Sequence, residues 1–276
     1  MQSVESPCGA LRAALRPTLY PAMSSDYRSL RVLLTAAVLL LAGASFVKAQ
    51  ITDGPPSKAK PSEAGWGFYK GWASGWTGLH QKMLARTAQG GVDVMFLGDS
   101  LTMLWDKEGK AVWDARFAPL KAANYGIGSD STRQMIWRLE NGELDNLNPK
   151  LVVLMIGTNN IYNDFNSGTD AEIVEGVAKI IALIHTKAPS AKVLLLGVLP
   201  RQNAFFTNRT AALNKALSAY AAHNKIQFLD ASANFLNAEG AIIPALFKPD
   251  QVHLTADGYQ ILGDAIQPAV TALLKP

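Results

Sequence analysis

Short apolar runs alternate with longer segments of helical periodicity along most of this chain. Runs that are apolar throughout are typical of strands buried on both faces of a sheet. Their alternation with helices requires right-handed crossovers, so it predicts a parallel sheet covered by helices on both faces. The predicted strands are residues 92–97, 121–124, 151–156, 193–199 and 226–229, and the predicted helices are residues 76–88, 131–139, 170–187, 207–224 and 256–274.

A serine follows the first predicted strand directly, in Gly98-Asp99-Ser100-Leu101. Because the apolar run ends at Gly98 and a helical pattern follows, we expect Ser100 at a strand-to-helix turn. Such a turn holds the hydroxyl out of the sheet and directs backbone N–H groups at whatever it attacks. The four residues alone are weak evidence, since a segment of this kind is commonly just the turn after a strand.

A serine hydroxyl needs a base to become a nucleophile, and His253 is the candidate among the four histidines. Asp250 lies three residues before it, so on an extended or turn backbone the carboxylate can reach the imidazole. Asp250 read alone is a helix cap or turn aspartate, and only the other segments favour a role beside His253. The histidines at 80, 185 and 223 lie within helical patterns and are interpreted as surface or packing residues.

Two further polar segments follow the second and third predicted strands. The first runs from Asn124 to Asp130 with glycines at 126 and 128, and the second is Gly157-Thr158-Asn159-Asn160. Sites in parallel sheets lie beyond the carboxyl ends of the strands, so both segments should converge on Ser100. A dinucleotide loop would need a third glycine, no phosphate loop is present, and no cluster has metal-ligand spacing. The sequence therefore implies neither cofactor nor metal.

These four segments, in this order, resemble the SGNH, or GDSL, hydrolase family. The segments 137–144, 149–150 and 157–160 are similar in particular to the catalytic subunits of platelet-activating-factor acetylhydrolase, and the resemblance runs from about Trp76 to the C-terminus. It implies a flavodoxin-like three-layer α/β sandwich with a central, mainly parallel five-stranded sheet. It also implies a carboxylic ester hydrolase in which Ser100, His253 and Asp250 form the catalytic triad.

The same resemblance implies the residues around the substrate. The backbone N–H groups of Ser100 and Ser129 and the side chain of Asn159 would form the oxyanion hole. Position 129 is a glycine in the family, so Ser129 either places a Cβ near the substrate or imposes a different φ. The matching positions imply that Leu101 and Val252 restrict the acyl group to acetyl, although ordinary core roles for both are equally consistent with the sequence.

The first 49 residues have the three parts of a secretory signal peptide. Basic residues precede Val32 to Val47, 16 residues without a charge, and Val47-Lys48-Ala49 is a small-residue cleavage pattern. We expect residues 1–49 to be removed, residues 50–65 to form a flexible linker, and residues 66–276 to form the hydrolase domain. Met23 is an alternative start, and a retained membrane anchor is the alternative to cleavage, although the run is short for a span.

Removal of this segment changes what the charge implies. It takes away five cations and two anions, so the formal net charge falls from +4 to +1, which argues against a nucleic-acid partner. The only cysteine, Cys8, would leave with it, so the mature protein would hold neither a disulfide nor a thiolate metal site.

Together these features predict a secreted or periplasmic, cofactor-independent serine esterase that acts on short-chain, in particular acetyl, esters of small molecules or glycans. Acetylated polysaccharide and small or lipid-like esters remain open as substrates, as does the oligomeric state. The rival from another class is a glycan-binding protein on a hydrolase scaffold. Retention of Ser100, Asn159, Asp250 and His253 favours the enzyme, because a binding module does not need all four.

Overall fold

The computed structural model describes residues 62, 73–162 and 168–275. The predicted signal segment, nearly all of the predicted linker and the predicted domain start at residue 66 lie outside the described residues. Within the described ranges, no helix combines the length and the apolar character that crossing a bilayer requires.

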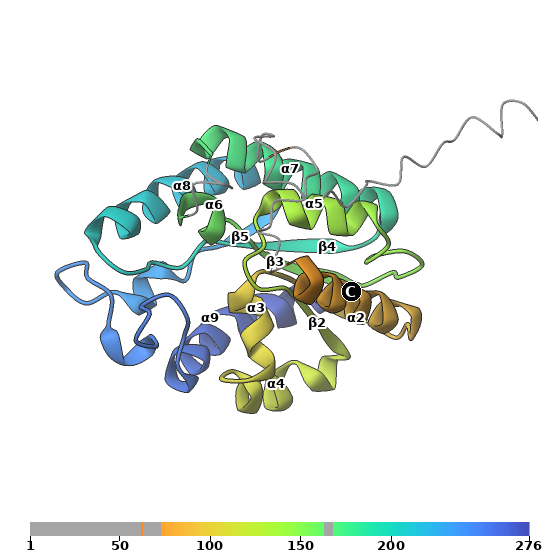
Figure 1. Cartoon of the computed structure of the whole chain (residues 1–276), viewed down its shortest axis with the longest axis horizontal. Coiled ribbons are helices and arrows are strands. Elements are labelled where there is room, and N and C mark those ends of the chain that lie inside the picture. The colour runs from red at the N-terminus through yellow and green to blue at the C-terminus, as the bar shows by residue number, and fades with distance from the viewer. Residues whose placement is uncertain (1–61, 63–72, 163–167, 276) are drawn as a thin grey trace, which may run out of the picture. The chain divides into compact units, whose positions relative to one another are not determined.

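The core of the fold is a five-stranded parallel sheet in the order β2-β1-β3-β4-β5 (Figure 1). This order is that of flavodoxin-like folds, in which the strand order reverses beside the first strand and creates a crevice there. All five predicted strands are confirmed, and the sheet is parallel throughout. The strands are β1 (Val94–Gly98), β2 (Ala122–Gly126), β3 (Leu151–Met155), β4 (Lys192–Leu196) and β5 (Gln227–Leu229).

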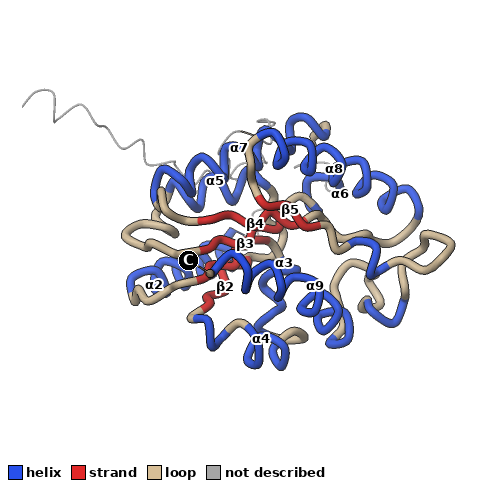
Figure 2. The backbone as a smooth tube through the Cα atoms, turned by 180° about the vertical axis from the view of Figure 1, so that it is seen from behind, coloured by secondary structure: helices blue, strands red, loops and turns tan. Residues whose placement is uncertain are grey.

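Successive strand residues face opposite layers, which explains why the central strands β1 and β3 carry no polar side chain. Met95 and Leu97 of β1 join one buried cluster with helices α5, α7 and α8, while Val94 and Phe96 join a second with α4 and α9. Figure 2 shows these helices on the two sides of the sheet. The helices are α2 (Ala73–Ala88), α3 (Ser100–Met103), α4 (Lys110–Arg116), α5 (Thr132–Glu140), α6 (Thr158–Tyr162), α7 (Asp170–Lys187), α8 (Ala204–His223) and α9 (Ala256–Leu274).

The strand register brings the three polar segments to one level. Gly98 at the end of β1 pairs with Gly126 of β2 on one side and with Met155 of β3 on the other. The residues that follow these three strands therefore emerge side by side at the carboxyl edge of the sheet, as the topology predicts.

Two glycines at this edge are required by close packing. A Cβ on Gly98 would lie 2.0 Å from Oγ1 of Thr102, and one on Gly126 would lie 2.1 Å from the backbone nitrogen of Met103. The short helix α3 thus packs directly on the ends of β1 and β2, and its position depends on the absence of these side chains. Gly126 therefore allows a close approach of two backbone segments.

Candidate active site

Ser100 is the first residue of α3 and lies next to His253, which precedes α9. The Oγ atom of Ser100 is 2.9 Å from Nε2 of His253, and Nδ1 of His253 is 2.7 Å from Oδ2 of Asp250. Because a carboxylate oxygen only accepts, Nδ1 carries the proton and Nε2 is left to accept from the serine hydroxyl. The three residues predicted from sequence are therefore joined by two hydrogen bonds in the order that serine activation requires.

The turn that carries Asp250 and His253 is held by its own backbone. The second carboxylate oxygen of Asp250 accepts hydrogen bonds from the N–H groups of Val252 and His253, each at 2.9 Å. The carbonyl oxygen of His253 accepts from the N–H of Lys248 at 2.7 Å, and Thr255 caps α9 immediately afterwards. These bonds explain why a spacing of three residues suffices to place the carboxylate against the imidazole.

The same bonds keep Asp250 ionised. Partial burial alone raises the pKa of this carboxyl, but the hydrogen bonds from the His253 ring and from the two backbone N–H groups outweigh it, and the pKa lies below its ordinary value. The negative charge that orients the imidazole is thus present throughout the neutral pH range.

Three further donors belong to residues that line the same cavity as the serine hydroxyl. The backbone N–H groups of Ser100 and Ser129 have no acceptor within the described parts of the chain. The side chain of Asn159 donates one N–H to the carbonyl oxygen of Asp130 at 2.8 Å, which fixes the amide and leaves its second N–H available. Ser100, Ser129 and Asn159 all line one cavity, so the structure brings together the three groups predicted for the oxyanion hole.

Ser129 occupies a left-handed backbone conformation with φ of +66°. Glycine adopts this region without cost, whereas an L-residue with a Cβ is strained there by roughly 1 to 2 kcal/mol. The departure from the family glycine has therefore kept the glycine-like backbone and placed a serine side chain at the cavity wall.

The cavity above Ser100 has a volume of about 860 Å³ and includes Val252 in its wall. Leu101 does not line it, and the expectation that Leu101 closes the acyl slot is corrected here. Its side chain is 2% exposed and packs in the cluster under α9, because consecutive residues of a helix point in directions about 100° apart. Ser100 faces the cavity, and Leu101 consequently faces the core.

The other histidines take no part in this arrangement. His80 is buried on α2, where its Nδ1 lies 2.9 Å from the carboxylate of Glu143, and His185 and His223 are exposed on α7 and α8. Their interpretation as packing or surface residues agrees with these positions.

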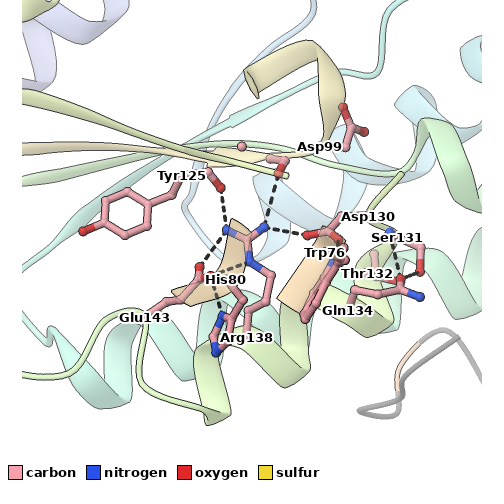
Figure 3. A network of polar contacts seen from close by, with 12 residues as sticks. Trp76, His80, Asp99, Tyr125, Asp130, Ser131, Thr132, Gln134, Arg138 and Glu143 are labelled. Atoms are coloured by element: carbon pink, nitrogen blue, oxygen red, sulfur yellow. Dashed lines mark hydrogen bonds and ion pairs between the residues drawn. The ribbon is translucent and has the colours of Figure 1, made fainter. Parts of the chain in front are cut away.

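A buried ion network is centred on Arg138 of α5 and includes Asp130, the residue that follows Ser129 (Figure 3). The guanidinium pairs with Asp130 and with Glu143, at 2.6 Å in each case, and all three side chains are fully buried. It also donates to the carbonyl oxygens of Tyr125, at 2.5 Å, and of Gly98. One arginine therefore joins the ends of β1 and β2, which carry the Ser100 and Ser129 segments. Trp76 of α2 adds a 2.6 Å hydrogen bond from its indole N–H to the carboxylate of Asp130.

Two fully buried carboxyl groups, those of Asp130 and Asp99, have raised pKa values. Burial raises the pKa of Asp130 to about 6, although the charge of Arg138 and the hydrogen bond from Trp76 act against it. Burial likewise raises the pKa of Asp99 to about 7. Asp99 caps α3 by accepting the N–H of Leu101 at 2.9 Å, so it supports the turn that presents Ser100.

Sequence reasoning missed several residues of the cavity wall, among them Trp76, Met103 and Arg201. Arg201 lies beyond the carboxyl end of β4, just as Ser100 and Asn159 lie beyond the ends of β1 and β3. Its position after a predicted strand could therefore have indicated a residue of the site. Among the described residues, no group of three or more His, Cys, Asp or Glu side chains is placed to share a metal ion.

With this fold and arrangement, the chain belongs to the GDSL-like lipase/acylhydrolase family, whose family model matches residues 96–261, and it is therefore an ester hydrolase. The platelet-activating factor acetylhydrolase IB subunit alpha2 of Homo sapiens is 35% identical over 204 residues, which are 72% of this chain and 85% of that protein.

Two solved structures are similar in fold. A GDSL-like lipase from Bacteroides thetaiotaomicron has a TM-score of 0.59 at 22% identity, covering 72% of this chain and 98% of that one. An acetylxylan esterase from Geobacillus stearothermophilus has a TM-score of 0.53 at 17% identity, covering 66% and 94%. At these identities the likeness concerns the fold alone.

Proposed function

We propose that this ester hydrolase cleaves short-chain acyl esters, in particular acetyl esters, through an acyl-enzyme on Ser100. The observation that carries the proposal is the pair of hydrogen bonds from Ser100 through His253 to Asp250 at the wall of the cavity. A hydroxyl bonded to an imidazole that is itself oriented by a carboxylate is the arrangement that makes a serine nucleophilic at neutral pH.

The proposed reaction follows from these contacts. As Oγ of Ser100 attacks the ester carbonyl, Nε2 of His253 takes the hydroxyl proton, and Asp250 stabilises the resulting imidazolium. The negative charge that develops on the carbonyl oxygen is stabilised by the free N–H groups of Ser100, Ser129 and Asn159, each such donor contributing about 2.7 to 4 kcal/mol. His253 then returns the proton to the leaving alcohol. A water molecule attacks the acyl-enzyme while Nε2 of His253 takes its proton, and return of that proton to Oγ of Ser100 releases the carboxylic acid and restores the enzyme.

The acyl preference and the alcohol are proposed on separate grounds. A relative that shares 35% identity carries the name acetylhydrolase, and Val252 lies in the cavity wall beside His253, where added methylenes would meet it. The alternative substrate is an O-acetylated polysaccharide, and one solved structure of similar fold is described as an acetylxylan esterase.

Hydrolysis of p-nitrophenyl acetate by the full chain, compared with its Ser100→Ala variant, tests the central proposal. We expect turnover by the wild type and labelling of Ser100 by a fluorophosphonate probe, both lost in the variant. Labelling of the Ser100→Ala variant at the wild-type level would show that another residue is the nucleophile. An acyl-chain series followed by acetylated xylan then separates the candidate substrates.

Export is a further part of the proposal, supported by the basic residues, the uncharged run and Val47-Lys48-Ala49 in the sequence. N-terminal sequencing of protein recovered outside the cytoplasm should begin at or near Gln50. Recovery of the intact chain in the membrane fraction would favour a retained anchor.

A further inference from the structure

Arg201 is a buried cation in the cavity wall that has no counter-ion among the residues that the structure describes. Its side chain lines the same cavity as Ser100 and His253, the residue is only 3% exposed, and it forms no ion pair with any carboxylate of the described residues. Arg138, which is also fully buried, pairs with two carboxylates. Buried charges are normally paired, so Arg201 is the exception that requires an explanation.

The guanidinium has unused donors on two of its three nitrogens. Nη1 donates to Thr158, at 3.1 Å to Oγ1 and 3.4 Å to the carbonyl oxygen. Nε is buried without an acceptor, and Nη2 makes no hydrogen bond within the described parts of the chain. A guanidinium binds anionic oxygens through its in-plane N–H groups, and Nη2, which unlike Nε is not fully buried, is the nitrogen that would donate to such an oxygen.

Two aromatic rings lie close to the guanidinium. The Cζ atom of Arg201 lies 4.2 Å from the centroid of Tyr162 and 5.7 Å from that of Phe206. These contacts offset part of the cost of burial. They do not offset all of it, because burial still lowers the pKa of Arg201, and the more distant charges of Asp99 and Asp250 do not compensate.

The segment around Arg201 is fixed on both sides. Its carbonyl oxygen accepts from the hydroxyl of Thr207 in α8 at 3.2 Å, and the N–H of Gln202 donates to the carbonyl oxygen of Gln251 at 2.9 Å. The second bond ties Arg201 to the turn that carries Asp250 and His253. The cation therefore has a set position relative to the proposed nucleophile and base, as a recognition group requires.

We propose that Arg201 binds an anionic oxygen group, a carboxylate or a phosphate, on the alcohol part of the ester substrate. This inference rests on the proposed function, because a cavity of about 860 Å³ far exceeds an acetyl group and leaves most of its volume for the alcohol. The substrate class is then an acetylated acid, whether an acidic sugar or a phosphate ester, in place of a neutral glycan.

The competing explanation is that Arg201 only positions Asn159. Its hydrogen bonds to Thr158 hold the turn that precedes this amide, so loss of Arg201 would weaken the oxyanion hole for every substrate alike. A recognition role changes the preference between charged and neutral ligands, whereas a positioning role lowers activity toward both equally.

The test measures binding in the full-length Ser100→Ala protein, where turnover does not interfere. Calorimetry compares 4-acetoxybenzoate and 4-acetoxyphenyl phosphate with the neutral 4-acetoxybenzamide, which shares their ring and ester. We expect at least one anion to bind about 10- to 100-fold more tightly than the amide, the range expected for a charge-assisted hydrogen-bonded contact. The tighter of the two anions identifies the group as carboxylate or phosphate.

Matched variants assign this preference to the arginine. Adding Arg201→Gln should abolish it and Arg201→Lys should retain part of it. Arg209→Gln, which removes the same charge from a side chain of α8 outside the cavity wall, should leave it intact, as should Thr158→Val. Equal binding of all three ligands by the parent protein, or loss of the preference in Thr158→Val, would overturn the proposal. Failure of the wild type to hydrolyse p-nitrophenyl acetate would instead refute the proposed function, because the binding comparison does not depend on turnover.

Discussion

Replacing Arg138 by methionine should destabilise the protein more strongly than any surface substitution. The change keeps an unbranched side chain of comparable length but leaves two fully buried carboxylates, Asp130 and Glu143, without their shared cation. It also removes a donor from the carbonyl oxygen of Tyr125. Breaking a buried pair in this way costs about 3 to 5 kcal/mol. For a domain of this size each kcal/mol corresponds to roughly 2 to 4 °C, so the melting temperature should fall by about 6 to 20 °C.

The loss should depend on pH with a definite sign. In the wild type the pKa of Asp130 is about 6 in the folded state against an ordinary value of 3.8, so folding already favours its protonated form. Without the charge of Arg138 that pKa rises further. A carboxyl whose folded pKa exceeds its unfolded pKa gives a stability that falls as pH rises through the folded value. The variant should therefore lie closer to the wild type at pH 5 than at pH 8, where only the variant still binds this proton.

Urea unfolding followed by circular dichroism at pH 5 and pH 8 measures both quantities. Lys110→Met is the matched control, because it removes a cation from an exposed pair with Asp114 and should cost less than about 1 kcal/mol at either pH. A loss below 1 kcal/mol for Arg138→Met, or an equal loss at both pH values, would refute the view that the network is a buried electrostatic unit.

Three further results are expected for the site. Ser100→Ala should lower the esterase kcat by roughly 10³- to 10⁶-fold without changing the urea midpoint, and a change below 10-fold would exclude it as nucleophile. Because Asp250 acts through His253, the double variant Asp250→Asn, His253→Ala should be about as slow as His253→Ala alone, and fully additive losses would place Asp250 elsewhere in the mechanism. Val252→Ala should move the optimum from acetyl toward longer acyl chains. Leu101→Ala should leave the optimum in place and lower the free energy of unfolding by about 2 to 5 kcal/mol. If activity measured with esters from acetyl to octanoyl showed the opposite pattern, Leu101 and not Val252 would limit the acyl group.

The sheet and the convergence of the site were predictable because both follow from short-range pattern and from topology. Each central strand is an apolar run that ends at a polar or glycine-containing segment, and parallel strands place those ends at one edge. Gly98, Gly126 and Met155 pair at one level, so no long-range information was needed to bring the Ser100 and Asn159 segments together. Helix α4 was not predicted, since its seven residues are too few for a clear periodicity.

The direction in which individual side chains point could not be predicted from the sequence as the sheet could. Leu101 and Val252 both adjoin a residue of the proposed triad in sequence, yet Val252 lines the cavity and Leu101 packs in the core. The difference arises from the local backbone: a helix turns neighbouring side chains about 100° apart, whereas the turn at Asp250 keeps Val252 beside His253. Adjacency in sequence therefore places a residue near a site without saying which way it faces.

The two buried arginines show a second limit, because a sequence displays charges without their counter-ions. Arg138 and Arg201 each lie within a few residues of polar segments, and nothing local distinguishes them. In the fold, Arg138 meets Asp130 and Glu143 and is neutralised, so its charge fastens the strands beneath the site. Arg201 meets a hydroxyl, a carbonyl and aromatic faces, and its charge remains directed to the cavity. The same type of side chain thus serves structure where its counter-ion is internal, and in our proposal it serves recognition where the substrate supplies the counter-ion.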